Sequence, residues 1–348
     1  MKKIIIISIL SIFMSCSTQK DTALTFRLNN TKQLTENGDN GEAYFSSDNK
    51  NLIFQSKRDG NSCDKIYTMT IDGEDIKPIP HTDGAFTCSY FSINDEHIFF
   101  SSTMQDGVQC PLVYKDPNPR KYIWPLRNFD IYRLSKDKKL KNLTQSNGYD
   151  AEATVHPYEE KIIFTSLRNG DIDLYEMDYD GNNLKRITTE FGYDGGAFYS
   201  PDGTKIVWRG WHPKNEQEII QWKNNINKNY IESVPLDIFI ADRDGTNKIQ
   251  LTNNGATNWS PSWHPSGDYI VFSSNKDDWL EEFDSYGPNF ELYLMEIQTG
   301  KLTRLTNNNT FDSFPVFSSD GHNLVFSSNR NAKNLRQTNI FIADFKLK

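Results

Sequence analysis

The sequence predicts an all-β protein, a six-bladed β-propeller built from four-stranded blades. A unit of roughly 45 residues recurs along the 348-residue chain, and each copy combines short apolar runs with tight turns. The clearest copy, residues 198–208, reads Phe-Tyr-Ser-Pro-Asp-Gly-Thr-Lys-Ile-Val-Trp. Five related runs begin at Tyr44, Tyr90, Thr154, Ser262 and Val316. Such self-similarity is typical of a propeller.

Each unit contains four strands in a fixed order. The first is the aromatic run before the Ser-Pro-Asp-Gly turn, where proline and glycine supply the fixed φ and the positive φ of a tight turn. The second is the apolar run that follows the turn, and the third alternates with period two, as in residues 173–175. After a further Asp-Gly turn in most copies, the fourth strand ends in Leu-Thr or a near match, as at residues 251–252.

The two ends of the chain close the ring. The first Leu-Thr ending, at residues 34–35, precedes the first aromatic strand. The sequence ends just after the third strand of the sixth unit. We therefore expect residues 25–35 to form the outer strand of the last blade, which removes the exposed edges of an open ring. The expected organisation is a lipoprotein signal peptide at 1–16, a tether at 17–24 and one propeller at 25–348, with no length left for a second domain.

The N-terminus predicts export. Met1-Lys2-Lys3 precedes an apolar run, residues 4–14, that is too short to span a bilayer. Ser15 then precedes Cys16, as in a lipobox, although Phe13 stands where an aliphatic residue is usual. We expect Cys16 to be lipidated and to anchor the protein in the cell envelope, in the outer membrane facing the periplasm. A plain cleaved signal peptide is the alternative.

Three further cysteines fall in the first two blades. An oxidising compartment permits one disulfide, with Cys63 and Cys110 as the candidates, but the pairing cannot be read from the sequence. Cys88, on an inner strand, can equally well be a buried thiol. No Cys-x-x-Cys or Cys/His pair has the spacing of a metal site.

Two long insertions interrupt the repeat. The blade-two insertion, residues 107–129, is rich in proline, and the blade-four insertion spans residues 210–235. In the latter, apolar residues at steps of three and four predict a short amphipathic helix; they are Ile219, Trp222, Ile226 and Tyr230. This helix either packs over a blade edge or forms a partner-binding arm. Blade five has a shorter acidic insertion at residues 277–284.

Alignment of the copies reveals a candidate binding ring. One equivalent position, five residues before the aligned aromatic of the first strand, holds Asn40, Phe86, Asp150, Asp194, Asn258 and Asp312. Two residues further, Glu42 and Glu152 share a column with Cys88, Gly196, Ser260 and Phe314. Around a channel mouth these oxygens could attract an amine or a cation such as calcium, and we expect no other cofactor. Alternatively, the Asp and Asn side chains cap the turn that enters the first strand.

Evidence for catalysis is weak. Glu42 and Glu152 could form a glycosidase pair only at a separation of about 5 to 9.5 Å, and no third feature supports that role. His156 and His264 occupy the serine position of the Ser-Pro-Asp-Gly turn, where the ring most simply bonds the turn backbone. No Gly-x-Ser-x-Gly elbow occurs. The net charge of -8, without any basic stripe, argues against nucleic-acid binding.

The repeats closely resemble the TolB-type propeller repeat. The resemblance rests on the unit at 200–208, the third strand at 173–178 and the run at 180–188, and it extends over residues 25–345. It implies a six-bladed ring. TolB itself binds the peptidoglycan-associated lipoprotein across one face and contacts inner-membrane partners through an N-terminal α/β domain. Only a short tether precedes the closing strand in this chain, so we expect that domain to be absent.

These features predict a monomeric, non-catalytic envelope module. The rigid ring would present the channel mouth and two long loops to a protein, peptide or glycan partner. The resemblance implies a Pal-like lipoprotein as one such partner and a role related to Tol-Pal envelope transport or integrity. The alternative is a propeller lyase or hydrolase that acts on an envelope or imported polysaccharide through Glu42, Glu152 and the acidic ring.

Overall fold

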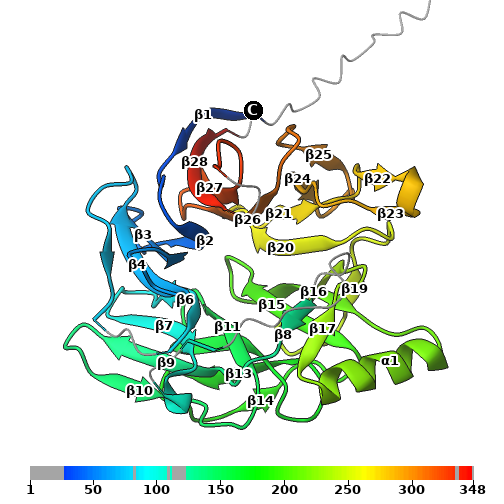
Figure 1. Ribbon diagram of the computed structural model, residues 1–348, viewed down its shortest axis with the longest axis horizontal. Coiled ribbons are helices and arrows are strands. Elements are labelled where there is room, and N and C mark those ends of the chain that lie inside the picture. The colour runs from blue at the N-terminus through cyan, green and yellow to red at the C-terminus, as the bar shows by residue number, and fades with distance from the viewer. Residues whose placement is uncertain (1–26, 81–83, 108–109, 112–122, 334–336, 347–348) are drawn as a thin grey trace, which may run out of the picture.

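The computed structural model describes residues 27–80, 84–107, 110–111, 123–333 and 337–346. Six four-stranded antiparallel sheets surround a central axis as blades (Figure 1), which confirms the predicted fold. The expected signal peptide, the lipidation of Cys16 and the tether all lie outside the described residues, as does part of the blade-two insertion. No helix in the described ranges combines the length and the apolar character that a membrane crossing requires.

Each blade runs from an inner strand at the axis to an outer strand at the rim. Blade one contains β2 (Asp39–Phe45), β3 (Asn51–Lys57), β4 (Lys65–Thr70) and β5 (Lys77–Pro78). Blade two contains β6 (Phe86–Phe91), β7 (His97–Ser102), β9 (Asp130–Ser135) and β10 (Leu140–Asn142). Blade three contains β11 (Asp150–Val155), β12 (Lys161–Ser166), β13 (Asp173–Asp178) and β14 (Lys185–Arg186). Blade four contains β15 (Tyr193–Tyr199), β16 (Lys205–Trp211), β18 (Asp237–Asp242) and β19 (Ile249–Gln250). Blade five contains β20 (Asn258–Trp263), β21 (Tyr269–Ser274), β24 (Glu291–Glu296) and β25 (Leu302–Arg304). Blade six contains β26 (Asp312–Phe317), β27 (Asn323–Ser328), β28 (Asn339–Phe345) and β1 (Leu28–Gln33).

The N-terminal strand closes blade six as predicted. Strand β1 pairs antiparallel with β28, with Leu28 opposite Phe345 and Gln33 opposite Phe341. The backbone N–H of Leu34 then donates to the carbonyl of Ile340 at 2.8 Å. Inside the ring, the first strands of successive blades contact one another all the way round. Strand β28 near the C-terminus therefore lies between β27 and β1, so it is not an open sheet edge.

The core lies between adjacent blades. Ile163 and Leu174 of blade three pack against Ile206, Trp208 and Phe239 of blade four, and similar apolar clusters fill the other interfaces. Trp208 is completely buried. Each sheet thus buries both faces against its neighbours, which accounts for the high aromatic content of the chain through the hydrophobic effect alone.

The blade-four insertion contains the predicted helix, α1 (Glu216–Asn227). Asn215 caps it, because its side chain accepts a hydrogen bond from the backbone N–H of Glu218 at 2.9 Å. Trp222 and Ile226 are buried along the predicted apolar stripe. Tyr230, expected on the same stripe, instead begins strand β17 (Tyr230–Glu232), because the helix ends before it.

The two long insertions join each other. Strand β17 of the blade-four insertion pairs antiparallel with β8 (Ile123–Pro125) of the blade-two insertion. We call this pair the β8–β17 ribbon. Smaller elements are η1 (Met104–Asp106) in blade two, and β22 (Trp279–Leu280), η2 (Glu281–Phe283) and β23 (Ser285–Tyr286) in blade five. Nothing in the sequence pattern indicated that two loops about a hundred residues apart would pair.

A disulfide attaches the blade-two insertion to blade one. It joins Cys63 and Cys110, whose Cα atoms lie 5.6 Å apart. Cys63 and Cys110 both pack into the apolar cluster that also contains Trp222 and Ile231. Cys88 is a free, buried thiol. The structure thus gives the pairing that the sequence left open.

Candidate functional site

Each inner strand carries a β-bulge at the same place. The register of all six first strands shifts against the second strand there. The residue at the bulge has a φ between 50° and 63°, a left-handed conformation that side chains other than glycine rarely adopt. These residues form the second column of the aligned repeats, Glu42, Cys88, Glu152, Gly196, Ser260 and Phe314. Together with Arg209 we call them the axis layer.

The second strand of one blade holds the bulge of the next. Gln55 accepts hydrogen bonds through Oε1 from the backbone N–H of Cys88 at 3.0 Å and from Oγ1 of Thr87 at 2.7 Å. In the same way, Oγ1 of Thr165 accepts from the backbone N–H of Gly196 at 3.0 Å. These bonds cross between blades and satisfy donors that the bulge removes from the strand ladder.

Arg209 and Glu152 form a buried ion pair in the axis layer. Nη2 of Arg209 donates to Oε1 of Glu152, and also to Oη of Tyr193 at 2.8 Å. Only 3% of Arg209 is exposed, and its guanidinium lies 3.8 Å from the ring centre of Trp259. Burial is the largest single influence and lowers the pKa of Arg209, but Glu152, Tyr193 and Tyr149 together raise it above its ordinary value. The guanidinium therefore stays charged.

Glycine at position 196 makes room for this arginine. A Cβ at Gly196 would lie 1.8 Å from Nη1 of Arg209. Sequence reasoning missed Arg209, although one signal was available. In the other five blades the equivalent second-strand position holds an uncharged residue: Gln55, Ser101, Thr165, Ser273 or Ser327. Arg209 is the one charged residue at this position, and it lies opposite the Gly195-Gly196 pair of its own blade.

Glu42 is the titratable group of the axis layer. Its burial, and next the charge of Glu152, raise its pKa to about 7, while Arg209 acts in the opposite direction. The thiol of Cys88 shares a hydrogen bond with Glu42, and burial raises the pKa of that thiol well above its ordinary value. Near neutral pH the axis layer thus contains a fixed ion pair beside a carboxyl that gains or loses its proton.

Aromatic residues lie on both sides of the axis layer. Two positions after the bulge, Tyr44, Tyr90 and Phe198 come from three different blades, and their ring centres lie 5.0 to 6.2 Å apart. On the other side, Trp124 of the β8–β17 ribbon lies 5.5 Å from Trp259 between ring centres. The two insertions therefore cover the end of the axis where the first strands begin, instead of forming two separate loops.

The predicted ring residues lie inside the blades. Each is 1% exposed or less: Asn40, Asp150, Asp194, Asn258 and Asp312. They bind neighbouring groups. Asp194 accepts from Nε1 of Trp208 at 2.6 Å, and Asp150 pairs with Arg168 at 3.0 Å. These positions do not match the expected open ring at a channel mouth, because each side chain is buried among hydrogen-bond partners of its own blade or of the blade before it, as where Asn40 donates to the carbonyl of Thr338 at 3.2 Å. They agree better with the alternative of a local hydrogen-bonding role.

The expected cation has no evident ligand set. Within the described ranges, no group of three or more His, Cys, Asp or Glu side chains is arranged to hold a metal ion. Of the predicted residues, the structure brings only Glu42 and Glu152 to the axis layer. His156 and His264 bond their own turns, since Nδ1 accepts from the backbone N–H of Glu159 at 3.0 Å and of Ser266 at 3.1 Å.

Comparison with known proteins supports the TolB resemblance. No protein-family model matches the chain. Over 115 residues, 32% of this chain, it is 35% identical to the Tol-Pal system protein TolB of Francisella tularensis subsp. mediasiatica, and the match spans 23% of that relative's length. The structure resembles TolB from Acinetobacter baumannii with a TM-score of 0.55 and 16% identity, over 88% of this chain and 63% of that one.

A second kind of propeller has a comparable fold. The oligogalacturonate lyase of Vibrio parahaemolyticus matches with a TM-score of 0.53 and 12% identity, over 92% of this chain and 96% of the lyase. At these identities the structural matches show the fold alone. The chain is a six-bladed β-propeller whose sequence is similar to that of TolB over about a third of its length.

Proposed function

We propose that this protein is a non-catalytic, monomeric module of the cell envelope, anchored through Cys16, which binds a protein partner on the rigid ring. The observation that carries the proposal is the internal pairing of the axis layer. Glu152 gives one oxygen to Arg209 and the other to Thr165, whose Oγ1 donates to it at 2.7 Å. Both oxygens of Glu152, a catalytic candidate from the sequence, are thus hydrogen-bonded within the protein.

The geometry of the axis layer favours binding over catalysis. A glycosidase pair needs two carboxyl groups that can both reach the substrate. Here the aromatic group of Tyr44, Tyr90 and Phe198 lies on one side of Glu42 and Glu152, and the β8–β17 ribbon covers the other. We infer that a partner contacts the loops on the outer faces of the ring.

The partner class follows from the sequence match. The matched relative is a Tol-Pal system protein, so a Pal-like envelope lipoprotein is the first candidate. Large apolar side chains are available for such a contact, since Tyr158 is 70% exposed, Phe283 54% and Trp279 47%. Exposed aromatic residues of this kind are enriched in protein interfaces.

Affinity capture tests the proposal directly. The full chain is cross-linked in envelope extracts, captured and analysed by mass spectrometry, and the main partner is then purified and titrated against it. We expect a stoichiometric complex with an envelope protein. Glu42→Gln should bind that protein as tightly as the parent chain does, because the axis layer takes no part. Failure to form a complex with any purified envelope protein would reject the proposal.

The second candidate is a polysaccharide lyase. Two observations favour it, the fold shared with oligogalacturonate lyase and the pKa of Glu42 of about 7, which suits a general base at neutral pH. Incubation with oligogalacturonate, followed by absorbance of the unsaturated product, tests this role. Product formed by the parent chain but not by Glu42→Gln would establish the lyase and overturn the non-catalytic module.

A further inference from the structure

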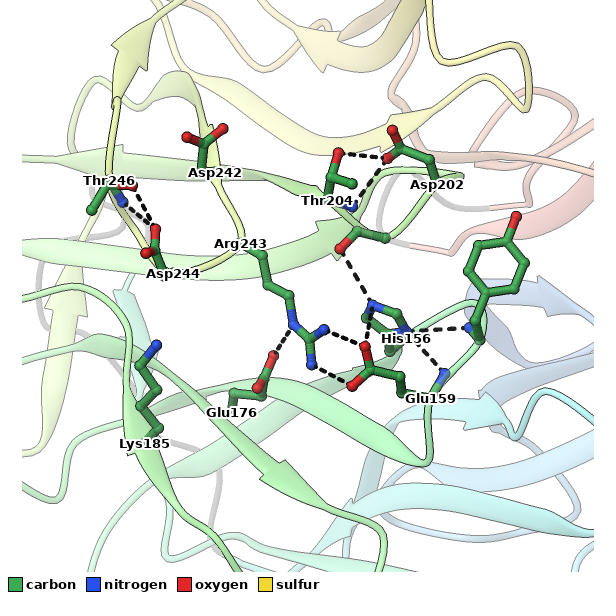
Figure 2. Close-up of a pocket in the computed structure, with 12 residues that line it drawn as sticks. His156, Glu159, Glu176, Lys185, Asp202, Thr204, Asp242, Arg243, Asp244 and Thr246 are labelled. Atoms are coloured by element: carbon green, nitrogen blue, oxygen red, sulfur yellow. Dashed lines mark hydrogen bonds and ion pairs between the residues drawn. The ribbon is translucent and has the colours of Figure 1, made fainter.

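A hollow of about 600 Å³ lies between the turns of blades three and four (Figure 2). The turns that line it follow the first and third strands of their blades, so the hollow opens on the face opposite the β8–β17 ribbon. Its size lies in the range of ligand sites, about 300 to 1,000 Å³. Of its lining residues, only Tyr158 is among the exposed side chains that the proposed function offers to a partner.

Arg243 forms the centre of the hollow. Its Nη1 and Nη2 donate to the two oxygens of Glu159 at 2.6 and 3.0 Å, and its Nε donates to Oε2 of Glu176 at 2.7 Å. Glu176 also accepts from Oη of Tyr199 at 2.8 Å. The bond from Arg243 lowers the pKa of Glu159, so this carboxyl stays ionised. We call these three hydrogen bonds of the guanidinium the Arg243 fork. Because Arg243 belongs to blade four and both glutamates belong to blade three, the fork joins the two blades and holds the floor of the hollow in place.

The rim carries carboxylates with an oxygen to spare. Oδ1 of Asp202 accepts from the backbone N–H of Thr204 at 3.0 Å, and Oδ1 of Asp244 accepts from that of Thr246 at 3.0 Å. In the described contacts, Oδ2 of each aspartate has no hydrogen-bond partner. Both aspartates are exposed. Hydrogen bonds within their turns lower their pKa values, chiefly the bond from the Ser200 hydroxyl to Asp202 and that from the Thr246 hydroxyl to Asp244.

Charge and apolar surface coincide at this place. Five carboxylates line the hollow, together with the basic side chains of Arg243, Lys185 and His156. Arg243 is already neutralised by Glu159 and Glu176, and burial lowers the pKa of His156. Of the five carboxylates, Asp242 pairs with Lys205 at 2.6 Å. Tyr158, in the lining, is 70% exposed, and Leu184, next to Lys185 in the chain, is 46% exposed. An exposed tyrosine ring and free carboxylate oxygens in one hollow suit guanidinium or ammonium groups, through cation–π contact and charge-assisted hydrogen bonds.

We propose that this hollow docks a positively charged segment of a protein partner, a stretch of chain that carries arginine or lysine side chains. The inference rests on the proposed binding function and specifies the chemistry of the partner. One basic side chain of the segment bonds the free oxygen of Asp202 and a second bonds that of Asp244, on opposite sides of the hollow (Figure 2), while an arginine of the segment stacks on Tyr158 and apolar neighbours cover Leu184. The fork of Arg243 with Glu159 and Glu176 keeps the floor rigid, so little ordering of the hollow accompanies binding.

The test uses the full chain and a blocked tetra-arginine peptide, titrated by calorimetry at low salt, with tetra-glutamate as the opposite charge. We expect tetra-arginine to bind and tetra-glutamate not to bind. The double variant Asp202→Asn/Asp244→Asn should weaken binding about tenfold, since two exposed ion pairs are lost. Asparagine keeps Oδ1 as an acceptor, so the turns are retained, and a melting curve checks this.

A matched variant separates docking from general attraction. Asp48→Asn/Asp180→Asn makes the same charge change in equivalent turns, where Asp48 accepts from Ser46 and Asp180 from Asn182, but neither residue lines the hollow. We expect this control to bind tetra-arginine within about twofold of the parent chain. Equal weakening in both variants, or no binding of tetra-arginine, would overturn the proposal.

The outcome is also distinguishable from failure of the proposed function. An envelope partner that binds the Asp202→Asn/Asp244→Asn chain at full affinity would leave the binding module intact but remove the hollow as its docking site. If no envelope protein binds the parent chain, the binding function fails, whatever the peptide titration shows.

Discussion

Replacement of Arg209 by methionine gives the sharpest test of the axis layer. Methionine retains much of the length and apolar stem of arginine but removes the charge that faces Glu152. Glu152 is 9% exposed and Arg209 3%, so the carboxylate would remain buried with Thr165 as its hydrogen-bond donor. The buried charge would then lack its counter-ion.

The expected loss of stability is large. Removal of one partner from a buried ion pair costs about 3 to 5 kcal/mol, because the other charge stays desolvated. The contact of Arg209 with Trp259, at 3.8 Å, is worth about 2 kcal/mol when desolvated. The bond from Thr165 to Glu152 is the same in both chains, so it does not enter the difference. We therefore expect Arg209→Met to lower the free energy of unfolding by about 5 kcal/mol or more.

Urea denaturation at pH 7.5 measures this loss, and a double-mutant cycle assigns it. Addition of Glu152→Gln to Arg209→Met should recover about 2 kcal/mol, since no buried charge is then left without a partner. Lys136→Met is the control. It breaks an ion pair with Glu96 in which both side chains are more than half exposed, so it should cost less than about 1 kcal/mol.

Two results would refute the reasoning. If Arg209→Met costs no more than Lys136→Met, the pair with Glu152 is not a buried, coupled pair. If the double variant is less stable than Arg209→Met alone, the unpaired carboxylate is not the source of the loss. Either result would return Glu152 to the groups available for chemistry.

Three further predictions concern the same part of the molecule. The pKa of Glu42 in the folded chain is about 7, above its ordinary value of 4.5. Between these pH values the folded state therefore holds a proton that the unfolded state has released. The free energy of unfolding should fall by up to about 3 kcal/mol as the pH rises from 4.5 through 7. Glu42→Gln should reduce this slope in urea midpoints taken at pH 5 and 8, and the remaining slope comes from Asp64 and Asp173, whose pKa values burial raises to about 6. An unchanged slope would contradict the assignment. Gly196→Ala should lower the free energy of unfolding by at least about 2 kcal/mol more than Gly170→Ala does. Both glycines have a positive φ, but an added Cβ meets Arg209 at Gly196 and nothing within 4 Å at Gly170. Equal losses of stability would show that Arg209 moves aside freely. Reduction of the Cys63–Cys110 disulfide, which closes 47 residues, should lower stability by about 4 kcal/mol in thermal melts, whereas a Cys63→Ser/Cys110→Ser chain should not respond to reductant.

The β8–β17 ribbon links these effects to the surface. It joins the insertions of blades two and four, and the disulfide secures one of them to blade one. Trp124 of the ribbon lies within 5.7 Å of the Arg209 guanidinium. A substitution in the axis layer therefore changes contacts with a segment that is attached to three blades. For this reason we expect the loss to appear in the free energy of unfolding of the whole propeller.

The sequence by itself determined the architecture. Six copies of one strand pattern specify six sheets, because a period-two apolar run between tight turns can bury its faces only against its neighbours. The spare Leu-Thr ending at residues 34–35 likewise specified the closing strand, and the 3-4 spacing of Trp222 and Ile226 specified the helix. These features depend on local periodicity, which a single chain displays directly.

Only the tertiary structure decided what the aligned columns do. Alignment placed Asp194 and Glu42 two positions apart in equivalent copies, but the bulge between the two columns turns Asp194 into its blade and Glu42 toward the axis. The pairing of β8 with β17 and the entry of Arg209 beside Gly196 depend on distances between segments far apart in the chain. Such contacts leave no local periodicity, so the residues were visible in the sequence while their partners were not.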